Sequence, residues 1–388
     1  MPDLVRRIDQ ATPADRDRAV DGLRALAILG VVLGHWLVTA LVVDTGTLHG
    51  DSPLRHMPEF TPVSWVFQTL AVFFFVGGQV AAGSYASAVA RGTSYGRWLA
   101  ARLGRLVRPV TVVLVVWSTA AGGMLAAGVG QKTVWALCKL VWSPLWFLLV
   151  FIVLSALTPL VARLHPLWPL ALVLNVDIVR FGFDAPGWLA SVNVIAGWLV
   201  PYCLGAAGAR GRLRSRTTGW ILLLGGAAAT VALVLWARYP ASMVGVPGQA
   251  VSNLDPPTLA VVTFGLAQCG AAVLLLGPLR RALRRPAAWA AIAMVNLYAM
   301  TIYLWHQTAM IVVTVVGMAV GAPRTGSRTV PDTLTWVGAR LLWLPVFALA
   351  LTALWALFRT YEQRRPTGGG VRAAGGERGA PMSAKRYG

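Results

Sequence analysis

Ten apolar runs, most of them about 20 residues long, follow one another along the 388-residue chain and constrain its fold more than any other feature. A helix of about 20 apolar residues crosses the hydrocarbon core of a bilayer and satisfies its own backbone hydrogen bonds there. The runs therefore predict an all-α integral membrane protein, a bundle of about ten transmembrane helices. Pro169 interrupts the fifth run and Asp177 closes it early, so this run predicts a short, tilted or re-entrant segment. The runs lie near residues 22–43, 65–88, 109–129, 144–162, 167–180, 188–209, 219–237, 258–277, 297–320 and 334–358.

The composition agrees with a membrane protein and argues against several other classes. Charged residues make up 12% of the chain, against about 25% in soluble proteins. The formal net charge of +20 alone would fit a nucleic-acid-binding protein. However, the basic residues lie in short connections between apolar runs, not in one patch, so nucleic acid is not an expected partner. Cys138, Cys203 and Cys269 have no paired or ligand-like spacing, so we expect no disulfide framework and no metal site.

Lysine and arginine are distributed unevenly between the two sides that ten spans would define. With a cytoplasmic N-terminus, 26 of the 34 basic residues lie on the cytoplasmic side, seven lie outside, and Arg340 lies within the tenth run. Acidic residues divide evenly and do not produce this asymmetry. Basic residues are retained on the cytoplasmic side of membrane proteins. The count therefore predicts a multi-pass protein with both termini cytoplasmic. We expect it in the cell (plasma) membrane, surrounded by membrane lipids.

The two ends of the chain are hydrophilic and define the predicted domain organisation. Residues 1–18 are expected to form a cytoplasmic N-terminal segment, and residues 19–361 the transmembrane domain. Residues 362–388 are rich in Gly, Arg and Ala, which predicts a disordered cytoplasmic tail. The first run is expected to be an anchor and not a cleaved signal peptide, because no small-residue cleavage site follows it. Residues 280–296 form a basic stretch that can be interpreted as an interfacial helix.

One histidine lies inside the first apolar run, and an arginine precedes it. In a helix, Arg24 and His35 would be about 16 Å apart along the axis and about 20° apart around it, on one face. This spacing predicts Arg24 near the membrane surface and His35 near mid-bilayer, where an ionisable residue is costly and usually functional. His35 is the candidate general base, and Arg24 can hold a phosphate or an acyl-donor carbonyl. The alternatives are a structural histidine and a snorkelling arginine. Asp21 is expected either to pair with Arg24 or to cap the helix start.

Polar side chains in the ninth and tenth runs are further candidates. Tyr303, His306 and Gln307 share one helical face, where they can bind substrate or form hydrogen bonds between helices. Arg340 lies about 9 Å into the tenth run from the predicted outer side. It is expected to contact the acceptor side of a site, or alternatively to snorkel outward.

Three residues in the second and fourth runs complete the candidate site. Trp146 begins the fourth run at the predicted outer interface, where it can bind substrate or belong to the aromatic belt. Gly77 and Gly78 follow three phenylalanines, and their lack of a side chain would let a helix or a ligand approach closely near the site.

Four stretches of the chain resemble, in order, the motifs of the acyltransferase 3 family of integral membrane acyltransferases. The resemblance covers essentially residues 18–358, and one departure is Gly77, where many members carry serine. The matching stretches are Asp21-Gly22-Leu23-Arg24-Ala25-Leu26-Ala27 leading to His35, Phe73-Phe74-Phe75-Val76-Gly77-Gly78, Leu145-Trp146-Phe147-Leu148, and Ile302-Tyr303-Leu304-Trp305-His306-Gln307.

The resemblance implies an acyltransferase that transfers groups other than aminoacyl groups. The acyl group, often acetyl, would come from cytoplasmic acyl-CoA, a donor substrate and not a bound cofactor. It would pass to a hydroxyl of a cell-surface carbohydrate, lipid-linked or secreted acceptor. The family's essential arginine and histidine fall on Arg24 and His35; His35 would act as base or carry the acyl group briefly. The rival interpretation is a multi-pass transporter of a small metabolite. Transporters, however, tend to have broken spans at matching places in two halves, whereas only the fifth run is broken here.

Overall fold

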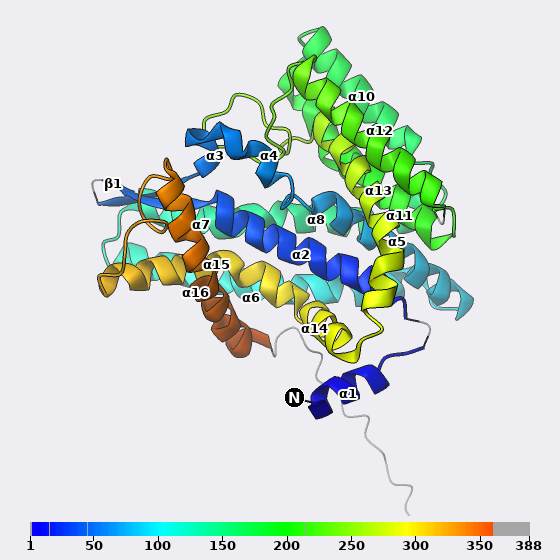
Figure 1. Ribbon diagram of the computed structural model, residues 1–388, viewed down its shortest axis with the longest axis horizontal. Helices are drawn as coiled ribbons and strands as arrows, with labels where there is room; N and C mark the ends of the chain where they lie inside the picture. The colour runs from blue at the N-terminus through cyan, green and yellow to red at the C-terminus, as the bar shows by residue number, and fades with distance from the viewer. Residues whose placement is uncertain (1, 15, 45, 214, 360–388) are drawn as a thin grey trace, which may run out of the picture.

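The computed structural model describes residues 2–359 except 15, 45 and 214, so the tail predicted over 362–388 lies outside the described residues. Within the described part, nine helical segments are long and apolar enough to cross a membrane. This confirms the predicted helical membrane protein, and Figure 1 shows these segments gathered into a bundle. They are α2 (Arg18–Val38), α5 (Leu70–Ala90), α6 (Tyr95–Ala126), α7 (Gln131–Trp142) joined through η2 (Ser143–Leu145) to α8 (Trp146–Ala156), η3 (Gly187–Ser191) joined to α11 (Val192–Ala209), α12 (Arg216–Leu235), α13 (Leu259–Ala282), α15 (Ala299–Ala319) and α16 (Leu334–Phe358).

The fifth apolar run forms α10 (Leu167–Gly182), which has 16 residues and is shorter than these spans. At helical rise it measures about 24 Å, less than the ~30 Å of a hydrocarbon core. Asp177 on this helix is buried and accepts hydrogen bonds from Asn193 (3.0 Å), Tyr239 (2.9 Å) and the backbone N–H of Leu259 (2.7 Å). Because its oxygens are satisfied, the carboxylate is tolerated in an apolar run and ties α10 to α11 and α13.

The sequence predicted that the first apolar run is helical to its end, but the structure shows otherwise. The helix α2 ends at Val38, and the chain continues into an antiparallel hairpin of β1 (Ala40–Asp44) and β2 (Thr47–Asp51). Gly46 has a φ of 81°, which turns the chain so that the apolar residues before it pair with a strand and leave the helix. His35 consequently lies in the last turn of α2 and not midway along the helix.

The second apolar run is helical only from Leu70, because the residues before α5 are held against α2 in an irregular conformation. The Thr69 hydroxyl donates to the carbonyl of Ala27 at 2.7 Å. Irregular backbone is tolerated at this depth when it is buried in protein. Three short elements connect the hairpin to α5: α3 (Pro53–His56), η1 (Pro58–Phe60) and α4 (Thr61–Ser64). A fourth short element, α9 (Thr158–Val161), follows α8.

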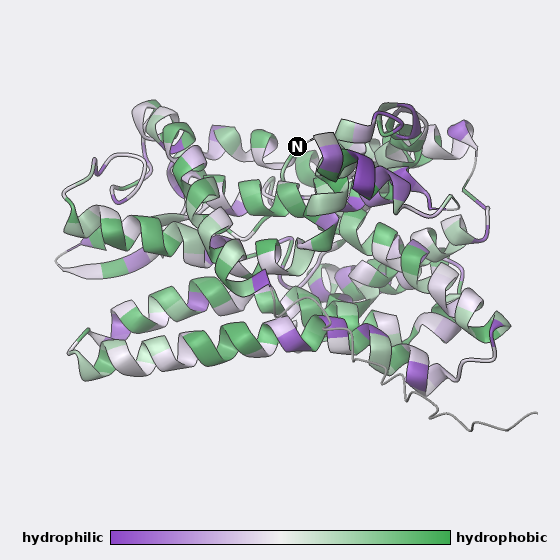
Figure 2. Cartoon of the chain, turned by 90° about the horizontal axis from the view of Figure 1, so that it is seen from below, coloured by the Kyte–Doolittle hydropathy of each residue, from purple (hydrophilic) through white to green (hydrophobic). Residues whose placement is uncertain are grey.

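The predicted interfacial stretch before the ninth run is a helix, α14 (Pro286–Leu297), and the N-terminal helix α1 (Pro2–Gln10) packs beside it. The indole N–H of Trp289 donates to Thr12 at 2.7 Å, and the Arg18 guanidinium lies 5.0 Å from the Trp289 ring centroid. In Figure 2 hydrophobic residues follow the long helices, whereas hydrophilic residues gather near the N-terminus. The N-terminal segment is therefore packed onto the bundle.

Helices α5 and α11 approach each other with backbone almost in contact. A Cβ atom on Gly78 would overlap the carbonyl oxygen of Tyr202, and one on Gly205 would overlap that of Phe75. A Cβ atom on Gly77 would overlap the Phe151 ring of α8. The glycine pair thus permits the close helix approach that the sequence predicted.

Replacing Gly78 with alanine is expected to lower the stability of the bundle by about 1–3 kcal/mol, because overpacking forces the two backbones apart. Gly83 on the same helix has open space where its Cβ would be. Gly83→Ala is the matched control, and we expect stability there to be unchanged or raised by about 0.5–1 kcal/mol. Thermal unfolding in detergent compares the two variants. Equal melting temperatures would contradict the close contact of α5 with α11.

Candidate active site

The last turn of α2 faces α15, and this contact brings three predicted residues together. The side-chain amide nitrogen of Gln307 lies 3.2 Å from Nδ1 of His35. The ring centroids of His35 and His306 are 5.0 Å apart. His35 is partly exposed, whereas His306 and Gln307 are 1% and 2% exposed. The partly exposed His35 is thus backed by two buried polar side chains.

The protonation pattern of His306 follows from its main-chain contact. Its Nδ1 lies 2.5 Å from the carbonyl oxygen of Tyr303, which can only accept a hydrogen bond, so Nδ1 carries the proton and donates. The other ring nitrogen, Nε2, is buried and has no hydrogen-bond partner within the described residues. A buried acceptor without a partner is costly, which makes this nitrogen a contact point for a ligand.

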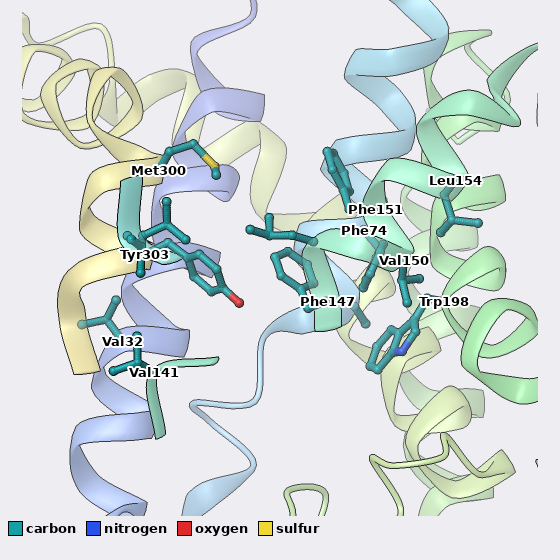
Figure 3. Packing of buried hydrophobic residues seen from close by; sticks show 14 of the residues in the cluster. Val32, Phe74, Val141, Phe147, Val150, Phe151, Leu154, Trp198, Met300 and Tyr303 are labelled. Carbon is teal, nitrogen blue, oxygen red and sulfur yellow. The ribbon is translucent and has the colours of Figure 1, made fainter. Parts of the chain in front are cut away.

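Tyr303 lies one helical turn before His306 and connects the histidine pair to an aromatic cluster. Its hydroxyl donates to the carbonyl of Pro144 at 2.5 Å, and its ring lies 5.4 Å from that of Phe147. Figure 3 shows Tyr303 reaching toward Phe147, with Phe74 and Trp198 beyond. Within the described residues, the hydroxyl of Tyr303 is thus engaged in holding α15 against η2.

Trp146, the predicted substrate-binding tryptophan, lies in this aromatic cluster and not beside the histidines. Its ring centroid is 6.1 Å from that of Trp198 on α11. Phe147, the next residue, makes the ring contact with Tyr303. Among the described residues, Trp146 makes a ring contact with Trp198 and none with either histidine.

Arg340 on α16 is buried, and it donates to three main-chain carbonyls and to the Met310 sulfur. It donates to the carbonyls of Trp36 (2.7 Å), Thr39 and Gly326 (2.9 Å). The carbonyls of Trp36 and Thr39 lie at the C-terminal end of α2, where helix carbonyls lack internal partners and favour a cation. The indole N–H of Trp36 in turn donates to the carbonyl of His306 at 2.9 Å. Arg340 therefore holds the end of α2 that carries His35.

The opposite end of α2 carries Arg24 and Asp21. Asp17, and not Asp21, caps the helix by accepting from the backbone N–H of Ala19. Asp21 forms an ion pair with Arg16 at 2.6 Å. Arg24 is half-buried in the second turn, about 16 Å along the axis from His35 at helical rise. The two predicted catalytic residues thus lie at different ends of one helix.

Comparison with known protein families identifies the family of this chain. A family model for the acyltransferase domain of acyltransferase 3 proteins matches residues 17–359. The chain belongs to the acyltransferase 3 family. The match runs from α2 through α16 and confirms the resemblance carried by the four motifs. Searches of curated proteins and of solved structures find no significant match. Family membership makes the chain a membrane acyltransferase and argues against the transporter interpretation.

Arg102 is a buried cation that the sequence analysis did not single out, because it counted this arginine among the basic residues of the connections between apolar runs. Arg102 on α6 is 9% exposed, with its Nε 3.4 Å from the Ser155 hydroxyl of α8. The guanidinium groups of Arg24 and Arg105 lie close enough to repel it electrostatically. Buried positions on α6 recur at helical spacing at Trp98, Arg102, Pro109, Val113 and Trp117, a pattern that was available in the sequence.

Proposed function

We propose that this acyltransferase moves an acyl group, most simply acetyl, from cytoplasmic acyl-CoA to a hydroxyl of a cell-surface carbohydrate, lipid-linked or secreted acceptor. The observation that carries the proposal is the partly exposed His35, held by Gln307 and backed by His306, within a chain of this family. A neutral imidazole has a free ring nitrogen that can remove a proton from a hydroxyl group.

The proposed reaction is a direct transfer. His35 takes the proton of the acceptor hydroxyl while the hydroxyl oxygen attacks the thioester carbonyl carbon. An oxygen–carbon bond forms, the carbon–sulfur bond breaks, and the released thiolate receives the proton from the imidazolium. The products are the acyl ester and free CoA, so no oxidant, reductant or metal ion is required for the balance.

The Arg24 end of α2 is the proposed entrance for the donor. Arg24, Arg102 and Arg105 concentrate positive charge there, and arginine binds phosphate oxygens in bidentate fashion. Acyl-CoA is elongated, with phosphates at one end and the thioester at the other, which suits sites separated along one helix. We propose that this end faces the cytoplasm of the cell, because 26 of the 34 basic residues fall on that side.

Replacing Arg24 with glutamine is expected to raise the KM for acyl-CoA about tenfold or more, since one charged hydrogen bond to phosphate contributes about 1.5–3 kcal/mol. kcat should change less, because the contact is present in both ground and transition states. Initial rates across acyl-CoA concentrations measure both constants. Arg163→Gln removes an exposed arginine of the same predicted side and serves as the control. An unchanged KM in R24Q would remove Arg24 from donor binding.

The function itself is tested with purified protein in lipid nanodiscs. Acetyl-CoA and longer acyl-CoAs are supplied with an envelope extract, release of free thiol is measured, and mass spectrometry identifies the acylated product. We expect thiol release that depends on the extract. Absence of transfer from every acyl-CoA, together with uptake of a small metabolite into proteoliposomes, would favour the transporter.

A further inference from the structure

We propose that Gln307 is a positioning residue that selects the reactive tautomer of His35. The inference rests on the proposed function, because it assigns a role within the same acyl transfer. A neutral imidazole carries one proton, on Nδ1 or on Nε2, and the hydrogen-bond partner of one nitrogen decides which. The Gln307 amide, 3.2 Å from Nδ1, is in the position to make that choice.

The orientation of the Gln307 amide determines the outcome. With its nitrogen toward His35, the amide donates to Nδ1, which forces the imidazole proton onto Nε2 and leaves no lone pair for a base. In that orientation Oε1 of Gln307 is buried without a hydrogen-bond partner within the described residues. A half-turn of the amide exchanges the two atoms with almost no change in shape. Oε1 then accepts from Nδ1–H, and Nε2 keeps its lone pair.

His306 shows why this choice must be made for His35. The Nδ1 of His306 is held by a main-chain carbonyl, so its tautomer does not depend on a side chain. His306, however, is buried, whereas His35 is partly exposed and is the proposed base. The tautomer of the His35 ring therefore depends on the Gln307 side chain, and a substitution at Gln307 can change it.

The proton balance of the step follows from this arrangement. The acceptor hydroxyl proton moves to Nε2 of His35, while the Nδ1 proton stays in its hydrogen bond to Oε1 of Gln307. The imidazolium then returns the Nε2 proton to the CoA thiolate. Gln307 neither gains nor loses a proton, and its oxygen stabilises the charged ring during the step.

Two substitutions test the role. Gln307→Leu keeps a similar volume and cannot accept, so kcat should fall about 10- to 1,000-fold with little change in either KM. Gln307→Glu can only accept, so kcat should recover to within about tenfold of wild type. Its carboxylate also stabilises the imidazolium, so the acidic limb of the pH–rate profile should move to higher pH. A role in packing alone would not move that limb.

The control is Gln79→Leu on α5. Gln79 is partly buried, and its Oε1, like that of Gln307, lacks a partner within the described residues. Its kcat should stay within about twofold of wild type. Nitrogen-15 NMR of wild-type protein with labelled histidine, assigned with a His35→Ala variant, should show protonated Nδ1 on His35. This measurement needs no Gln307 variant to fold. Protonated Nε2, or an unchanged kcat and pH profile in Q307L, overturns the inference. Failure of the wild type to transfer any acyl group would instead overturn the proposed function.

Discussion

Replacing His35 with alanine is expected to lower kcat for acyl transfer about 100- to 10,000-fold, the range that a general base contributes. KM for acyl-CoA should change little, because the proposed phosphate contacts lie at the other end of α2. The fold should persist: His35 is partly exposed and loses one hydrogen bond, to Gln307, worth about 1 kcal/mol. Thiol release and product mass, measured at saturating acyl-CoA, give the rate.

His165→Ala is the matched control, because His165 is exposed and lies in the connection between α9 and α10. Its kcat and melting temperature should equal those of wild type. If H35A transferred acyl groups at the wild-type rate, His35 would have no part in the chemistry. Trapping of an acyl group on wild-type His35, detected by mass spectrometry, would replace the proposed base with a covalent carrier.

Replacing Arg340 with methionine is expected to destabilise the protein by about 3 kcal/mol or more. The carbonyls of Trp36, Thr39 and Gly326 would lose their charged donor, and each unsatisfied buried group costs about 1–3 kcal/mol. The ring contacts of the guanidinium with Trp336 and Phe347, at 5.3 and 4.8 Å, would also be lost. Thermal unfolding in detergent measures the change, and activity should fall with the displaced end of α2.

Arg340→Lys separates this structural role from contact with the acceptor. One ammonium cannot reach three carbonyls in the geometry of a guanidinium, so the melting temperature should lie between those of wild type and R340M. Arg324→Met removes an exposed arginine from the loop before α16 and should leave stability unchanged. A raised KM for the acceptor in R340K, with a wild-type melting temperature, would show that Arg340 contacts substrate instead.

The fold was largely predictable because membrane spans depend on local hydrophobicity and length. Nine of the ten predicted runs correspond to full-length helices within the described residues, and the broken run forms the shorter α10. The error in the first run arose at its end, where apolar residues enter a hairpin. Hydrophobicity alone does not distinguish a buried helix from a buried strand, and Gly46 was the local signal for the turn.

The candidate site was predictable in its members and less so in its geometry. Tyr303, His306 and Gln307 were expected on one face of a helix, and they lie near one another at the contact with α2. The contacts of Arg340 with carbonyls of α2 were not predictable, since they join residues about 300 positions apart. The burial of Arg102 could have been found from the helical spacing of apolar residues on α6.

The sequence by itself determined that the chain is a helical membrane acyltransferase with Arg24 and His35 on one helix, because composition, run length and motif order are local properties. The tertiary structure decided what these residues contact. It placed His35 in the last turn of α2, against the Gln307 amide, and made Arg340 the support of that turn. Such contacts join segments distant in the chain, and they exist only when the helices are packed.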